Sequence, residues 1–262
     1  MLSLKPYLKA IEMKPGEYDK SAYPFSIPAI KTLEYLEFHA DITFLVGENG
    51  SGKSTILEAI AEVIGLGAQG GTRNFHIKDA GGKSGLDSSL RVMRNYQKPR
   101  DMYFLRAESF YNVATFMDNL AAEGGPPEQV LSRYGGKSLH KRSHGESFMS
   151  ALTTGFGGKG LYILDEPESA LSPAKQLKAI QRISELIHDD SQFIIATHSP
   201  IFMAFPNALI YMLDENGIRE IAYEDTEHYQ ITTNFLTDYK QQITRLLSRQ
   251  PLLDWLEDNS KT

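Results

Sequence analysis

A nine-residue glycine-rich stretch constrains the fold of this chain more than any other part of the sequence. It reads Gly47-Glu48-Asn49-Gly50-Ser51-Gly52-Lys53-Ser54-Thr55 and matches the pattern G-x-x-x-x-G-K-[ST]. The apolar residues 42–46 predict a buried strand before it, and residues 56–64 predict an amphipathic helix after it, ended by Gly65. When a strand, a glycine-rich loop and a helix follow one another, the backbone N–H groups of the loop and the N-terminus of the helix can surround a phosphate. The stretch therefore predicts a phosphate-binding loop.

The residue types in the loop predict separate roles. The Lys53 ammonium would reach the β- and γ-phosphates of a nucleotide, and the Ser54 hydroxyl would ligate Mg²⁺. The rest of the loop would bind the nucleotide beside these two: Gly47, Glu48, Asn49, Gly50, Ser51, Gly52 and Thr55. A chance glycine-rich turn before a helix is the alternative, and the flanking strand and helix argue against it.

Composition narrows the class of protein. The 262 residues fit one large α/β domain or two small ones, and 41% of them are hydrophobic. No apolar run approaches the roughly 20 residues that span a bilayer, and no signal peptide is recognisable. The absence of cysteines excludes disulfides and is compatible with a cytoplasmic protein. The net charge of −6 gives no overall basic footprint for nucleic acid.

The region before the loop predicts a small antiparallel layer. Residues 7–13 and 33–38 alternate between apolar and polar side chains. Residues 23–28 are too rich in proline for a central strand, and we interpret them as an edge strand. An aromatic side chain of this region would stack on an adenine ring or would simply fill the core of the layer. The candidates are Tyr23, Phe25 and Phe38.

A second strong pattern lies at residues 161–168. Four apolar residues predict a strand, and Asp165 and Glu166 follow at its carboxyl end, where α/β sheets place their ligands. We expect Asp165 to hold Mg²⁺ and Glu166 to orient or deprotonate an attacking water. An ordinary acidic junction between strand and loop is the alternative for one carboxylate. It explains the adjacent pair poorly in a chain that already carries a phosphate loop.

Two weaker patterns point to the same chemistry. His198 follows the predicted buried strand 192–197 and would stand near the γ-phosphate. Ser143 and Glu146 form a capping-box pattern, which predicts a helix start with a natural anion site beside Gly145. A plain helix cap would also explain that pattern.

In this order, these motifs resemble those of the ABC-type ATPase domain. Residues 47–55 match its Walker A motif, residues 161–166 its Walker B motif, and His198 its switch histidine. Residues 143–146 match its signature and residues 169–172 its D-loop. The chain looks most similar to the small stand-alone bacterial ATPases related to the SMC and recombination-repair proteins, through residues 104–110 and 143–148.

Two residues depart from the family pattern. The family's Q-loop glutamine is replaced by Glu108, which we expect to touch Mg²⁺ or its water. Gln97 is the alternative, although it precedes the strand. His144 replaces the first glycine of the signature, so an imidazole stands where backbone normally approaches the γ-phosphate.

The resemblance implies an α/β fold of the P-loop type, with a mixed central sheet, an N-terminal antiparallel layer and a small helical lobe. It divides a single domain, residues 1–262, into three parts. Residues 1–107 and 159–225 would form the nucleotide-binding core, and residues 108–158 the helical lobe. Residues 226–262 would form C-terminal helices.

The resemblance also implies ATP and Mg²⁺ as cofactors and an ATP-dependent homodimer. In a head-to-tail pair, each nucleotide would lie between the phosphate loop of one copy and Ser143 of the other. Glu166 and His198 would be catalytic. Hydrolysis would open the dimer and act as a conformational switch.

Three functions stay open at this point. The first is a soluble, cytoplasmic ATPase in a DNA-repair or defence complex, with DNA or a protein as partner. The second is the ATPase subunit of a membrane transporter, against which the missing Q-loop glutamine and the altered signature argue. The third is a module that senses ATP with little turnover, against which Glu166 and His198 argue.

Overall fold

The computed structural model of the chain describes residues 5–16, 18–67, 70–72, 75–76, 85–107 and 144–248. It divides into two compact units, Met1–Ile221 and Ala222–Thr262. Each unit is described by itself.

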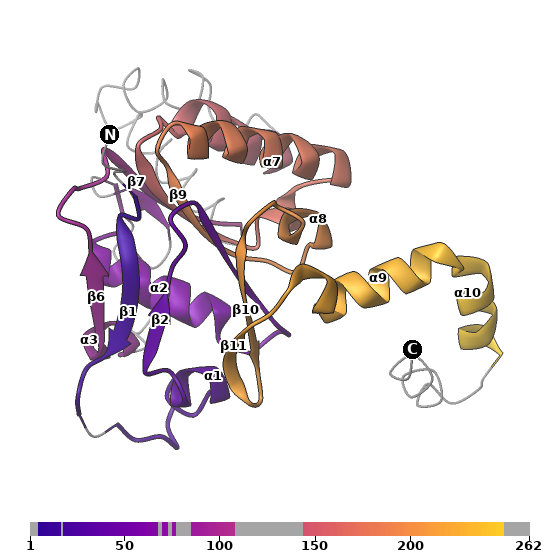
Figure 1. Cartoon of the computed structure of the whole chain (residues 1–262), viewed down its shortest axis with the longest axis horizontal. Helices are drawn as coiled ribbons and strands as arrows, with labels where there is room; N and C mark the ends of the chain where they lie inside the picture. The colour runs from indigo at the N-terminus through magenta and orange to yellow at the C-terminus, as the bar shows by residue number, and fades with distance from the viewer. Residues whose placement is uncertain are drawn as a thin grey trace. The chain divides into compact units, whose positions relative to one another are not determined.

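A mixed sheet forms the centre of the first unit. Its strands are arranged in the order β11-β10-β3-β9-β8-β7-β4-β5, and the five from β10 to β7 run parallel (Figure 1). Strands β11, β4 and β5 are antiparallel additions at the two edges. The bounds are β3 Ile42–Val46, β4 Gly71–Thr72, β5 Phe75–His76, β7 Asp101–Arg106, β8 Gly160–Asp165, β9 Gln192–Ala196, β10 Leu209–Asp214 and β11 Gly217–Glu220.

A second, three-stranded antiparallel sheet confirms the predicted N-terminal layer. Its strand order is β2-β1-β6, with bounds β1 Leu8–Met13, β2 Tyr35–Glu37 and β6 Leu90–Arg94. The buried Gln192 side chain joins the two sheets, because it donates to Leu8 O at 2.8 Å and accepts from Leu8 N at 2.9 Å.

The helices of the first unit cover both faces of the central sheet. Figure 1 shows α2 and α7 on opposite sides of its strands, with α2 beside the small sheet. The bounds are α1 Pro28–Lys31, α2 Lys53–Ile64, α3 Leu86–Ser89, α6 His144–Ser150, α7 Pro173–His188 and α8 Pro200–Met203. The shorter elements are the π-helix η2 Ala151–Gly155 and the 3-10 helix η3 Pro167–Ala170.

Alternation along the strands produces two cores. One face presents Phe104, Ile163 and Ile194 to the apolar side of α2, in a cluster that extends into the small sheet. The other face carries a row of rings, in which Tyr162 stacks on Phe156 at 4.1 Å and packs against Phe193 at 5.1 Å. Every described residue of β3, β8 and β9 is buried, as a parallel sheet covered on both faces requires.

The described residues of the second unit, 222–248, contain three short helical elements. Their bounds are η4 Tyr223–Asp225, α9 Glu227–Thr237 and α10 Tyr239–Leu247. Thr226 caps α9, because its side-chain oxygen accepts from Tyr229 N at 3.3 Å. The division of the chain into core, lobe and C-terminal helices remains a prediction, since residues 108–143 lie outside the described residues.

Two sequence predictions about local structure are wrong. Residues 23–28 form a turn that leads into α1 and no strand, because Pro28 suits the first turn of a helix. The helical spacing of Leu177, Ile180, Ile183 and Ile187 predicts that this row is the buried face of α7, yet 61% of Leu177 is exposed. The buried face is made of Gln176, Ala179, Ile183 and Leu186, so it shares Ile183 with the predicted row and is otherwise turned away from it.

Candidate nucleotide-binding site

The carboxyl ends of four parallel strands bring the candidate residues together. Asp165 at the end of β8 pairs with Arg106 of β7 on one side and with Ala196 of β9 on the other. Ala196 pairs in turn with Leu45, next to the start of the phosphate loop. Because ligands of α/β proteins bind at this edge of the sheet, the register alone assembles a site from distant parts of the chain.

Backbone geometry shapes the loop between β3 and α2. Gly47, Gly50 and Gly52 have φ angles of +144°, +83° and +102°, which favour glycine. A Cβ atom on Gly47 would lie 2.2 Å from the carbonyl oxygen of Leu213, so no other residue fits there without a shift of β10. The sequence-predicted loop is therefore a tight cradle, and α2 begins at Lys53 directly behind it.

The Lys53 side chain is buried within this cradle. It is 4% exposed, and its ammonium donates to the carbonyl oxygens of Gly47 at 2.7 Å and Glu48 at 2.9 Å. Burial lowers the Lys53 pKa, and nearby carboxylates, Glu166 first among them, oppose that shift. Ser51 Oγ is buried and makes no hydrogen bond with the described residues. An ammonium and an unsatisfied hydroxyl inside a glycine cradle fit a phosphate group.

Two oxygens beside the loop fit a magnesium ion. Ser54 Oγ donates to Asp165 Oδ1 at 3.1 Å, so a hydroxyl and a carboxylate face the same point. Burial raises the Asp165 pKa to about 6, while Arg106 and the Ser54 hydrogen bond act in the opposite direction. Among the described residues no three His, Cys, Asp or Glu side chains form a metal cluster. Mg²⁺ needs no such cluster, since it is held by one or two carboxylates together with substrate phosphates.

Glu166 and His198 face each other at the edge of the site. Glu166 has a φ of +48°, and its N–H donates to Ala196 O at 2.9 Å. His198 Nε2 lies 3.7 Å from Glu166 Oε1, with 27% and 36% of the two side chains exposed. A glutamate whose backbone lies in the left-handed region is strained, so the surrounding structure must stabilise it. Such strain is common in functional sites.

The structure adds two residues that sequence reasoning missed. Arg106 of β7 contacts Asp165 through Nε at 3.3 Å and also pairs with Glu58 of α2. Glu168 accepts hydrogen bonds from Thr197 Oγ1 and from the backbone N–H of His198. Arg106 lies within residues 104–110 and Glu168 within residues 161–168, two stretches whose sequence patterns are described above. Only the order of the strands, which the motifs do not specify, shows which groups they contact.

The signature segment is described only in part. Ser143 and Glu108 lie outside the described residues, so their predicted roles remain predictions. Gly145 lies in α6 against the stretch that resembles the D-loop, where a Cβ atom would be 2.6 Å from Ala170 O. Glu146 is exposed in the same helix.

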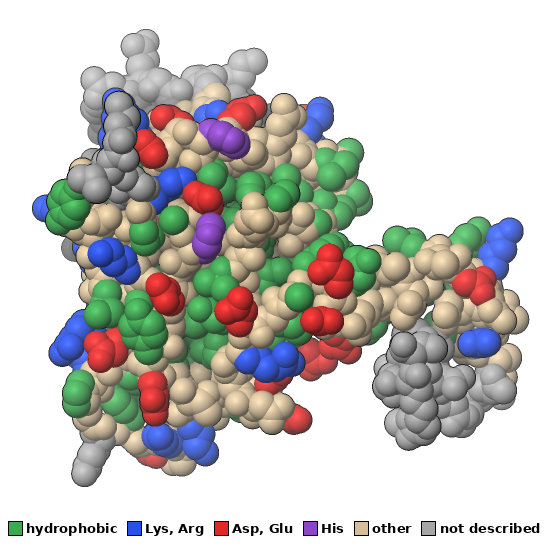
Figure 2. All heavy atoms as spheres, in the orientation of Figure 1, with side chains coloured by type: hydrophobic (Ala, Val, Ile, Leu, Met, Phe, Trp, Pro, Cys, Tyr) green, Lys and Arg blue, Asp and Glu red, His purple; other side chains and the backbone are tan. Residues whose placement is uncertain are grey.

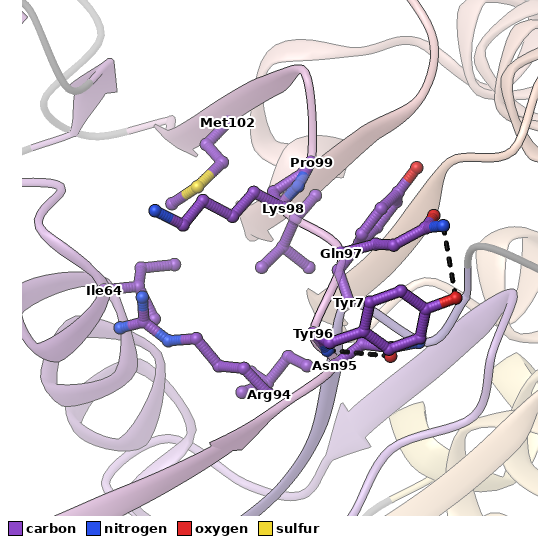
Figure 3. Close-up of a pocket in the computed structure, with 11 residues that line it drawn as sticks. Tyr7, Ile64, Arg94, Asn95, Tyr96, Gln97, Lys98, Pro99 and Met102 are labelled. Atoms are coloured by element: carbon purple, nitrogen blue, oxygen red, sulfur yellow. Dashed lines mark hydrogen bonds between the residues drawn. The ribbon is translucent and has the colours of Figure 1, made fainter.

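Gln97, the alternative to Glu108, lies elsewhere. Figure 3 shows it beside a cavity that Tyr7, Arg94 and Lys98 also line. Met102 borders this cavity from the beginning of β7, whereas Arg106, near Asp165, ends the same strand. Gln97 is therefore at the opposite end of the strand from the site, and the alternative is wrong.

Of the three aromatic candidates for the adenine, one is placed beside the loop. Tyr23 is 66% exposed, and its hydroxyl lies 3.4 Å from Thr55 Oγ1 on α2. Phe38 belongs to the hydrophobic core, and Phe25 stacks on Tyr18 at 5.0 Å.

Two family models match separate parts of the chain. One, described as "AAA domain", matches residues 26–116 and so includes the phosphate loop. The other, "AAA domain, putative AbiEii toxin, Type IV TA system", matches residues 147–204 and so includes Asp165, Glu166 and His198.

The chain is also similar to curated relatives and to solved structures. The energy-coupling factor transporter ATP-binding protein EcfA2 of Methanospirillum hungatei is 29% identical over 89% of this chain, which spans 62% of that protein. The SMC head domain of Thermotoga maritima is 14% identical, with a TM-score of 0.43, over 83% of this chain and 99% of that one. A dimeric ATP-binding cassette bound to ADP and Pi is 17% identical, with a TM-score of 0.47, over 84% and 99%.

The motifs, the sheet order and the family models lead to one conclusion. A phosphate loop between β3 and α2 faces an Asp-Glu pair at the carboxyl end of β8 and a histidine after β9. The prediction from the sequence is confirmed at this level: the chain carries the site of a P-loop ATPase and is similar to AAA domains and to ABC-type ATP-binding proteins.

Proposed function

We propose that this chain hydrolyses ATP to ADP and phosphate at composite sites of a head-to-tail homodimer and uses the cycle as a conformational switch. The observation that carries the proposal is that the side chains of Glu166 and His198 are partly exposed to solvent, whereas the neighbouring Lys53 and Asp165 are buried. The described residues therefore enclose the site on the side of Lys53 and Asp165 and leave it open on the side of Glu166.

The residues divide the work of binding. The loop N–H groups and Lys53 hold the phosphates, and Ser54 with Asp165 would hold Mg²⁺. A bound Mg²⁺ would neutralise charge on the phosphate oxygens. We assign Tyr23 to the adenine ring, since this exposed aromatic ring lies beside Thr55 at the first turn of α2.

The chemical step follows from the placement of two side chains. The Glu166 carboxylate would orient a water for attack on the γ-phosphorus and accept its proton as the bond to the leaving oxygen breaks. His198, 3.7 Å from that carboxylate, would contact the γ-phosphate and keep Glu166 directed toward the water. Both groups work best in a site closed to bulk water.

A second copy would supply the missing wall. Among the described elements, α6 packs against η2, η3 and α7, so this helix lies on its own D-loop stretch. In the proposed dimer the signature residues Ser143, Gly145 and Glu146 would reach the phosphates bound to another copy. Closure over Glu166 would then require ATP, because the γ-phosphate is the group that both copies contact.

Two biological settings suit an ATPase of this kind. We favour a cytoplasmic ATPase of the stand-alone type related to SMC and repair proteins, acting in a repair or defence complex with DNA or a protein. Acidic and basic side chains are interspersed on the face shown in Figure 2, which favours a protein partner over a basic DNA-binding surface there.

A transporter subunit is the second candidate. The name of the EcfA2 relative favours it. None of the helices in the described part of the chain is long and apolar enough to cross a membrane. Co-purification with a membrane protein would select this candidate, and stimulation of ATP hydrolysis by DNA or by a soluble partner would select the first.

Mixing two inactive variants tests the composite site. Lys53→Ala removes the phosphate contact of a copy's own loop, and Ser143→Arg blocks the surface that this copy offers to its partner. A mixed dimer has one site in which neither change is present. We expect each variant alone to be inactive and the mixture to regain up to about a quarter of wild-type turnover. A mixture that stays inactive, although the mixed dimer forms, would overturn the composite site.

A further inference from the structure

Hydrogen bonds at the end of β9 give Glu168 a task that the sequence motifs do not assign. We propose that Glu168 is a positioning residue, which holds His198 in place opposite Glu166. The inference rests on the proposed function of the Glu166–His198 pair and deepens it.

The Glu168 carboxylate binds the histidine-bearing turn at two adjacent points. Thr197 Oγ1 donates to Oε2 at 2.8 Å, and the backbone N–H of His198 donates to Oε1 at 2.5 Å. Each carboxylate oxygen thus accepts from a different residue of the turn. This bidentate contact fixes both the position and the direction of the backbone from which the His198 side chain leaves.

The backbone that carries Glu168 is also held in place. Glu168 lies two residues after Glu166, in the 3-10 helix η3 that begins at Pro167. The N–H and the hydroxyl of Ser169 donate to Glu166 O at 3.1 and 2.9 Å, which holds this short helix against the strand end. The distance of 3.7 Å between His198 and Glu166 is therefore set by one compact element.

A second set of hydrogen bonds, made by Ser199 and Gln176, supports the same turn. Ser199 N donates to Thr197 Oγ1 at 3.0 Å, and Ser199 Oγ donates to Gln176 Oε1 at 2.6 Å. Gln176 Nε2 in turn donates to Leu171 O at 3.1 Å. Residues 168–176 and 197–199 are consequently bound together through buried polar groups, and the stretch that resembles the D-loop lies between the two sets of hydrogen bonds.

The carboxylate is suited to positioning rather than to chemistry. Both of its oxygens are engaged by Thr197 and His198, so neither is directed at a reacting group. Burial raises the Glu168 pKa, while the two donors favour the ionised form. A neutral amide of the same shape would accept at one of the two positions only, and would turn its own donors toward the other.

Steady-state kinetics of Glu168→Gln test the proposal. We expect kcat to fall about ten- to hundredfold, the effect of one or two lost charge-assisted hydrogen bonds, with KM for ATP changed less than about threefold. Amide hydrogen exchange at His198 should become faster, which needs no turnover to be measured. Glu185→Gln, an exposed carboxylate of α7, is the matched control and should behave as wild type.

A double mutant separates positioning from general structural support. In a His198→Ala background the change Glu168→Gln should cost nothing further, because the side chain to be positioned is gone. An added loss of the same size as in wild type, or a loss confined to KM, would overturn the proposal. If Glu168→Gln does not fold, Thr197→Val and its conservative partner Thr197→Ser decide by the same measurements.

Failure of the Glu168 contact and failure of ATP hydrolysis give different results. Should the wild-type protein not hydrolyse ATP, the proposed function fails, and His198 exchange in Glu168→Gln still reports on the contact. Unchanged exchange at His198 in a folded variant would overturn the positioning contact, whatever the activity of the wild type.

Discussion

The phosphate loop and the strand ends opposite it are built by different means. The loop is shaped by its own backbone, with three glycines at positive φ and a Lys53 ammonium that binds carbonyls of the same loop. The strand ends are held by side chains from separate elements, such as Arg106 and Glu168. A local motif can therefore encode the first region, whereas the second exists only after the sheet has formed.

The largest expected effect concerns the backbone of the loop. Gly47→Ala places a Cβ atom 2.2 Å from Leu213 O at a φ of +144°, so we expect a loss of about 3 kcal/mol or more in the free energy of unfolding. Chemical denaturation measures it. Gly65→Ala is the control, since its φ is also positive but no atom lies within 4 Å of the added Cβ. It should cost only about 1 kcal/mol. Equal losses in the two variants would show that the close approach of β10 does not matter.

The second effect concerns the charge inside the loop. Lys53→Ala removes the ammonium that we assign to the phosphates, and we expect ATP affinity to fall at least about a hundredfold. Isothermal titration calorimetry measures it, with Lys178→Ala on the exposed side of α7 as the control. Unchanged ATP affinity would refute the assignment of the loop.

The third effect tests the buried carboxylate at the strand end. The Asp165 pKa is raised to about 6, so the folded state retains a proton that the unfolded state loses between about pH 4 and 6. Ionisation of the buried Asp165 carboxyl therefore lowers the free energy of unfolding as pH rises through that window. In metal-free buffer we expect Asp165→Asn to be more stable than wild type by about 1–3 kcal/mol at pH 7.

Thermal unfolding with a chelator present measures this difference. It should shrink as pH is lowered from 7 toward 5. A less stable Asp165→Asn, or a difference independent of pH, would contradict the raised pKa.

The smallest effect concerns the adenine. Tyr23→Ala removes the exposed ring next to Thr55, and we expect ATP affinity to fall about tenfold, as for loss of one base-stacking contact. Tyr23→Phe should retain nearly all of the affinity. Tyr96→Ala, an exposed tyrosine that lines the cavity of Figure 3, is the control. If Tyr23→Ala binds like wild type, another group holds the base.

The same contrast explains what could be predicted from the sequence. The loop and the strand 160–165 with its acidic end follow from local patterns and are present. The neighbours of Asp165 could not be predicted, because they depend on β9 lying between β3 and β8. Leu177 was misplaced because a helix with several apolar rows offers more than one face, and tertiary packing chooses between them.

The glutamate at the strand end gives the most direct test of the central claim. Glu166→Gln keeps the shape of the side chain and removes its capacity to accept a proton. With Mg²⁺ and ATP, size-exclusion chromatography with light scattering and a phosphate-release assay report assembly and turnover together. We predict a stable dimer that retains ATP and releases no phosphate, while the nucleotide-free variant is monomeric. Wild-type turnover by Glu166→Gln, or a monomer with ATP bound, would contradict the account.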